Sequence, residues 1–172
     1  MEFVKENDKK LLELAKAAIK ERNGYTICFI GINFFDELSK EIKNKLVDTL
    51  IRIKSAKYIY RFASQVKDAP MNRLAIGIAA TRDVEYIEMF AKLEGAPVEY
   101  LAGVVAKIGS AQDIYRFAMN VDNAPKEKLA KAICKQGTAF DIETYAYDVM
   151  HVPAEEFMKE YNVNFDIEAE IE

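Results

Sequence analysis

The pentapeptide IYRFA stands at residues 59–63 of this chain and again at residues 114–118. The prolines extend this duplication, because Pro70, Pro97, Pro125 and Pro153 follow one another at intervals of 27, 28 and 28 residues. Before each proline comes an isoleucine, with an aromatic residue three positions later and then alanine. These sets are Ile59, Phe62 and Ala63; Ile87, Phe90 and Ala91; Ile114, Phe117 and Ala118; and Ile142, Tyr145 and Ala146. The spacing predicts four repeats, at residues 55–82, 83–109, 110–137 and 138–162.

Each repeat has the pattern of two short helices. In the first repeat Ile59, Phe62, Ala63 and Val66 recur with the spacing of one helical face, and a narrower stripe of the same period begins at Leu74. Four residues before the isoleucine of each repeat stands a residue that favours the helix N-cap, namely Ser55, Asp83, Ser110 or Thr138. We therefore predict that the first helix of each repeat begins directly after this residue.

The turn between the two helices is also visible in the sequence. Two residues before each proline stand Asp68, Gly95, Asn123 and His151, and these residue types tolerate a positive φ. Proline suits the start of a helix and keeps the residue before it out of the α region. We interpret the four residues as left-handed caps that end the first helix. This interpretation assigns the only histidine to a turn.

The segments at either end of the repeats are less regular. Residues 7–54 predict a degenerate helical cap, with helices over about 8–22 and over 36–53. For residues 25–35, YTICFIGINFF, we prefer a buried helix, with a strand as the alternative because β-formers are dense there. Residues 163–172 form an acidic tail in which apolar and polar residues alternate. This tail either pairs as a strand, with residues 25–35 or another chain, orders against the basic third repeat, or stays solvated.

A helix pair of this length cannot bury its apolar stripe alone, so neighbouring pairs are expected to stack. The two-helix unit with its mid-repeat proline resembles the HEAT and armadillo class of helical-repeat proteins, over residues 55–161. Its unit of 27 or 28 residues is shorter than is usual in that class. The resemblance implies an all-α fold, an α-solenoid of about ten short helices in one domain over residues 1–172. It also implies a curved surface that binds proteins or, less often, nucleic acids.

Composition places the chain among cytoplasmic globular proteins. Half of the residues are apolar and 30% are charged, no apolar run is long enough to span a bilayer, and the first residues lack a signal-peptide pattern. The net charge of −4 hides an asymmetry. Residues 1–138 carry 23 basic and 18 acidic side chains, a net +5, whereas residues 139–172 carry one basic and 10 acidic side chains, a net −9.

The sequence contains no recognisable constellation for catalysis, and we predict that the protein is not an enzyme. A histidine-dependent nucleophile would have to use His151, and the glycines form no phosphate-binding loop. Cys28 and Cys134 are too few for a disulfide framework and fit no metal spacing. Cys134 occupies the position of Ala79 and Ala106 in other repeats, so we expect it in the core. No catalytic residue, cofactor or metal ligand is therefore assigned.

The second helices carry the charges that favour a binding surface. Their positions outside the apolar stripe include Arg73, Glu99, Tyr100, Lys107, Lys128, Lys131 and Lys135. The third repeat is the most basic, and its lysines would attract an acidic partner. We predict a protein-interaction module, an adaptor or an inhibitor that docks on a larger protein, as a monomer or weak dimer without a membrane. The alternatives are a nucleic-acid-binding repeat protein or a nucleic-acid mimic that uses the acidic tail.

Overall fold

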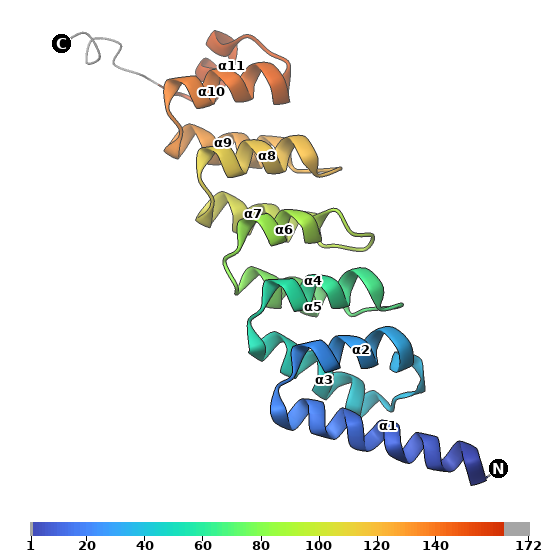
Figure 1. Ribbon diagram of the computed structural model, residues 1–172. Coiled ribbons are helices and arrows are strands. Elements are labelled where there is room, and N and C mark those ends of the chain that lie inside the picture. Colours follow the sequence, from blue (N-terminus) through green and yellow to red (C-terminus); the bar gives the residue numbers. More distant parts are fainter. Residues whose placement is uncertain (1, 164–172) are drawn as a thin grey trace. The chain divides into compact units, whose positions relative to one another are not determined.

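A computed structural model describes residues 2–163, and side chains from residue 9 onwards (Figure 1). Every regular element within residues 2–163 is helical, which confirms the predicted all-α class. The chain divides into two compact units, residues 1–97 and residues 98–172. Their boundary at Pro97 lies between the two helices of the second repeat. A strand is one of the alternatives predicted for residues 163–172. Of these residues, only Val163 lies within the described part of the chain.

The first unit contains α1 (Glu2–Glu21), α2 (Gly24–Phe34), a 3₁₀ turn (Phe35–Glu37), α3 (Lys40–Ile53), α4 (Ala56–Gln65), α5 (Met71–Ala79) and α6 (Val84–Ala91). Its helices contact one another in two rows. One row consists of α1, α3 and α5, and the other consists of α2, α4 and α6. Each helix also contacts its partner in the other row, as α4 contacts α5 (Figure 1).

The second unit contains α7 (Val98–Ile108), α8 (Ala111–Asn120), α9 (Lys126–Gln136), α10 (Ala139–Tyr145), a π-helical turn η2 (Ala146–Met150) and α11 (Ala154–Glu160). Here α7 contacts α9 in one row, and α8 contacts α10 and η2 in the other. Contacts of α9 with α8 and with α10 join the two rows. Within each unit, therefore, helices two positions apart in the chain pack side by side, whereas α11 contacts α10 and η2.

The repeated apolar residues form the core. The isoleucine and the aromatic residue of all four repeats are fully buried, as are Leu74, Leu101, Leu129 and Phe157 of the second helices. The last repeat has Tyr145 where the others have phenylalanine, and its hydroxyl donates to the backbone oxygen of Lys126 at 2.8 Å. This bond satisfies a polar group that burial would otherwise leave unpaired.

The turns confirm the predicted positive φ. The φ angle is 53° at Asp68, 74° at Gly95, 57° at Asn123 and 58° at His151. Only His151 directly follows its helix, because α4, α6 and α8 end three or four residues before the left-handed residue. The interpretation of all four as caps is therefore wrong for three of them. In those three repeats an extra turn of chain, rather than the left-handed residue itself, ends the helix.

The helix starts follow the N-cap residues. All four first helices begin directly after Ser55, Asp83, Ser110 or Thr138. The side chains of Asp83, Ser110 and Thr138 accept a backbone N–H of the first turn, whereas Ser55 makes no such bond. Ser110 and Thr138 complete reciprocal capping boxes with Asp113 and Asp141. The acidic residues at these helix starts thus have a structural role.

The irregular first segment departs from prediction at two helix starts. The helix predicted over about residues 8–22 already begins at Glu2. Residues 24–34 form a helix, as preferred over the strand. The helix predicted over residues 36–53 begins only at Lys40, because the hydroxyl of Ser39 accepts the N–H of Ile42 and so starts the helix there. Residues 35–37 form the separate 3₁₀ turn.

Replacement of a buried aromatic should show that the stripe holds the helices together. Phe117 is 0% exposed, so Phe117→Ala should lower the free energy of unfolding by about 3–5 kcal/mol through lost burial and a cavity. Phe140 is 75% exposed, and Phe140→Ala should change the free energy of unfolding by less than about 0.5 kcal/mol. Urea denaturation followed by circular dichroism measures both. Equal effects of the two substitutions would contradict the assigned core.

The turn of the second repeat allows backbone strain to be tested alone. A Cβ added at Gly95 would meet only Met71 Cγ at 3.7 Å, an ordinary contact, while the φ of 74° disfavours any L side chain. Gly95→Ala should therefore destabilise the protein by about 1–2 kcal/mol. For Asn123→Gly, at the equivalent turn, the free energy of unfolding should stay within about 0.5 kcal/mol of that of the wild type. A neutral Gly95→Ala in the same denaturation experiment would show that the turn relaxes.

Candidate functional site

The predicted surface residues lie on three helices. Arg73 is on α5 of the first unit, whereas Glu99, Tyr100 and Lys107 are on α7 and the remaining lysines on α9 of the second unit. The residues of the second unit come together because α7 and α9 pack side by side. We call Lys107, Lys128, Lys131 and Lys135 the lysine face.

One member of the lysine face is bound within the unit. The Nζ of Lys128 lies 2.6 Å from a carboxylate oxygen of Glu99 and 3.2 Å from the backbone oxygen of the same residue. Lys128 crosses over Gly103 to reach α7, and a Cβ at Gly103 would lie 3.2 Å from this Nζ. The absence of a side chain at Gly103 therefore gives Lys128 room to join the two helices.

Arg73 has the same kind of role in the first unit. Its guanidinium donates to Asp48 at 2.6 Å and to Asn44 at 2.7 Å, and both acceptors are on α3. The charges of Arg73, Lys128 and their acidic partners are thus largely compensated. Of the predicted surface set, these residues hold neighbouring helices together, since Arg73 joins α5 to α3 and Lys128 joins α9 to α7.

The remaining lysines are open to solvent. Lys107, Lys131 and Lys135 are exposed, and none of them forms an ion pair with residues 2–163. Together with Lys128 they line a groove of about 330 Å³ between α7 and α9. Ala106 and Ala132 also line this groove. It thus combines uncompensated positive charge with small apolar residues.

A second hollow, of about 540 Å³, lies on the other side of α9. Lys131 and Lys135 line it as well, and Tyr161, Asn162 and Val163, at the end of α11, also line it. The two lysines therefore stand between two hollows. Sequence reasoning missed the contribution of Asn162, although an asparagine two residues after a predicted helix is a common signal for a left-handed turn.

Cys134 also lines the second hollow, and it is only half-buried. The prediction that this cysteine belongs to the core is therefore only partly correct. Burial raises the pKa of the Cys134 thiol. Cys28, by contrast, is fully buried, and its thiol donates to the backbone oxygen of Tyr58. Burial raises the pKa of Cys28 to about 11.

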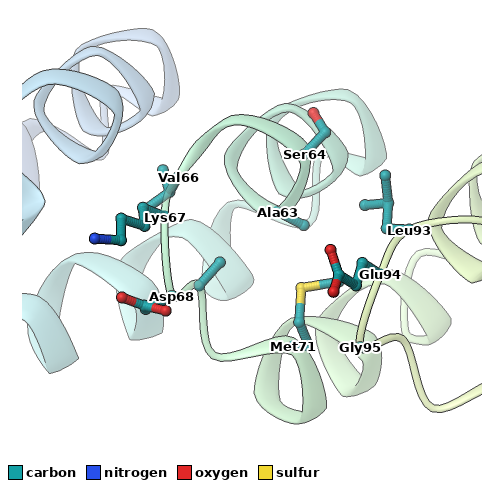
Figure 2. A pocket seen from close by; sticks show the side chains of 10 residues that line it. Ala63, Ser64, Val66, Lys67, Asp68, Met71, Leu93, Glu94 and Gly95 are labelled. Atoms are coloured by element: carbon teal, nitrogen blue, oxygen red, sulfur yellow. The ribbon is translucent and has the colours of Figure 1, made fainter.

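The first unit has a hollow of about 450 Å³ at the turns that follow α4 and α6. Figure 2 shows Met71 and Glu94 beside one another in this hollow, while the Lys67 side chain points away from them. Asp68 and Ser64 are the other polar side chains that line it. Their charges are mixed and do not converge on one point, so this hollow offers weaker electrostatic selectivity than the lysine face.

No group of three or more potential metal ligands occurs among the described residues. Within the same part of the chain, no helix is long and apolar enough to cross a membrane. Comparison with family models, with curated proteins and with solved structures finds no match to this chain.

Thiol labelling should distinguish the two cysteines. A raised pKa lowers the fraction of reactive thiolate at a given pH, and at pH 8 a thiol with a pKa of about 11 is about one part in a thousand thiolate. Ellman's reagent at pH 8 should therefore modify Cys134 well before Cys28. The two should react alike in 6 M guanidinium, and Cys134→Ser should remove only the faster phase. A fast phase that persists in Cys134→Ser would contradict the burial of Cys28.

Proposed function

We propose that the protein is a protein-interaction module whose lysine face binds an acidic segment of another protein. The observation that carries this proposal is the grouping of Lys107, Lys131 and Lys135 along one groove without ion-pair partners among residues 2–163. A groove with one sign of charge concentrates ligands of the opposite sign and guides their approach. The small residues Ala106 and Ala132 let an extended peptide backbone come close.

The order of helices within each unit supports the same role. In both units helix pairs pack in two rows, as in HEAT and armadillo proteins, which this sequence resembles through its mid-repeat proline. The lysine face lies on two helices that pack side by side, and the pair of Lys128 and Glu99 bridges them. We therefore propose a surface on two packed helices that recognises the negative charge and the length of a flexible partner segment.

Binding to nucleic acid is the second candidate, because phosphates would also satisfy these lysines. Three of the six arginines of the chain already contact other side chains. Arg61 lies over the ring of Tyr25, Arg73 pairs with Asp48, and Arg116 pairs with Asp113. Phosphate recognition commonly relies on arginine for bidentate contacts. Arg116 is the only arginine of residues 98–172, and its pairing with Asp113 therefore favours an acidic protein segment over nucleic acid at the lysine face.

A labelled peptide of eight glutamates should bind the protein at low salt. Replacement of Lys107, Lys131 and Lys135 by glutamine should weaken this binding about tenfold, equivalent to ~1.4 kcal/mol, because three uncompensated charges are lost. The matched control replaces the exposed Lys20, Lys57 and Lys67 of the first unit by glutamine and changes net charge equally. Fluorescence anisotropy measures the affinities, and thermal unfolding verifies that both variants fold.

The control variant decides between specific and general attraction. An equal loss in both variants would contradict the lysine face as the binding surface. A single-stranded oligonucleotide serves as the competing probe. If it binds more tightly than the peptide, with a steep dependence on salt, the nucleic-acid function replaces the proposed one.

A further inference from the structure

We propose that residues 164–172 of this chain dock in cis on Lys131 and Lys135 and compete with the external partner. The described chain ends in the second hollow itself, since Asn162 and Val163 line it together with these two lysines. The segment that follows thus begins next to two side chains that have no ion-pair partner within residues 2–163.

The end of α11 fixes the direction in which the chain enters the hollow. Asn162 has a φ of 53°. Its N–H donates to the backbone oxygen of Lys159, and the N–H of Val163 donates to that of Met158 at 2.9 Å. This pair of bonds around a left-handed residue is a Schellman motif, which satisfies the last carbonyls of a helix. The position of Val163 is therefore set by backbone hydrogen bonds.

The charge of the following segment complements the lysines. Residues 164–172 contain Asp166, Glu168, Glu170 and Glu172 and no basic residue. The acids occupy every second position, so an extended bound segment would present all four carboxylates on one side. Near the hollow, burial and the negative charges of Glu160 and Glu127 raise the pKa of Tyr161. These carboxylates would repel the segment and favour the side of the hollow that carries the lysines.

The segment is long enough to cover the lysine face. An extended chain spans at most about 3.6 Å per residue, so Asp166 lies within roughly 11 Å of Val163 along the chain. Lys128 and Lys135 are seven residues apart on α9, which corresponds to about 10 Å. Individual exposed ion pairs are weak, at about 0.2–1 kcal/mol. Covalent attachment offsets this weakness, because a short tether gives the segment an effective concentration in the millimolar range.

Occupation of Lys131 and Lys135 in cis would regulate the proposed binding surface, because both lysines also line the groove between α7 and α9. An external acidic segment would have to displace the internal one. This regulation rests on the proposed function, whereas the docking itself does not. The two therefore require separate measurements.

Zero-length cross-linking of the full chain tests the docking. A carbodiimide joins carboxylates to lysine amines in direct contact, and mass spectrometry locates the products. We expect cross-links from Asp166 and Glu168 to Lys131 and Lys135, with Lys20 and Lys57 as exposed controls. Links spread evenly over all lysines, or none from these acids, would overturn the docking. A mixture of ¹⁵N-labelled and unlabelled protein should yield links within one chain; mixed links would replace the cis contact by a second copy.

Peptide affinity tests the competition. A full-length variant with Asp166→Asn, Glu168→Gln, Glu170→Gln and Glu172→Gln should bind the eight-glutamate peptide about fivefold more tightly, because the tethered competitor loses its charge. The gain should vanish when Lys131 and Lys135 are also glutamine. Cross-links without any peptide binding would contradict the proposed function and support the docking of residues 164–172. Peptide binding through the lysines, without cross-links and without tighter binding in the neutralised variant, would contradict the docking alone.

Discussion

The burial of one isoleucine and one aromatic side chain per repeat is the constraint on which the rest of the structure depends. Helices of seven to eleven residues are too short to be stable in water by themselves. Ile114 and Phe117 on α8 are fully buried, and α7, α9, α10 and η2 all pack against this helix. Since every first helix repeats this stripe, every one needs neighbours on two sides. Stacking in two rows within each unit meets this requirement.

The stacking also explains the irregular positions of the sequence. Tyr145 replaces phenylalanine where its hydroxyl can reach the Lys126 carbonyl, so the aromatic stripe continues without an unpaired polar group. The turns use left-handed residues because the chain must reverse within a few residues before each proline. Ser110 and Thr138 fix the start of their helices through capping boxes. These local interactions set where the helices begin and where the chain turns.

Side-by-side packing of helices brings charges that are distant in the sequence together on one surface. The pair of Lys128 and Glu99 ties α9 to α7, and Lys131 and Lys135 follow Lys128 on the same face of α9. These two lysines are left exposed between two hollows. The proposed binding of acidic segments, external or internal, depends on this division of roles. One lysine stabilises the helix pair, and its neighbours retain their charge for a ligand.

The sequence by itself determined the helices of the four repeats, the starts of their first helices and the positive φ in the turns between them. This was possible because caps, prolines and left-handed residues act over a few positions and recur four times, so each repeat supported the interpretation of the others. It did not determine where α1 and α3 begin. Residues 36–38 have helical composition, and only the Ser39 cap separates them from α3. Tertiary structure alone decided which charges are compensated. Arg73 and Lys128 looked like Lys131 in the sequence, but their partners Asp48 and Glu99 lie 25 and 29 residues away. Such pairing depends on which helices lie side by side, and no local pattern contains that information.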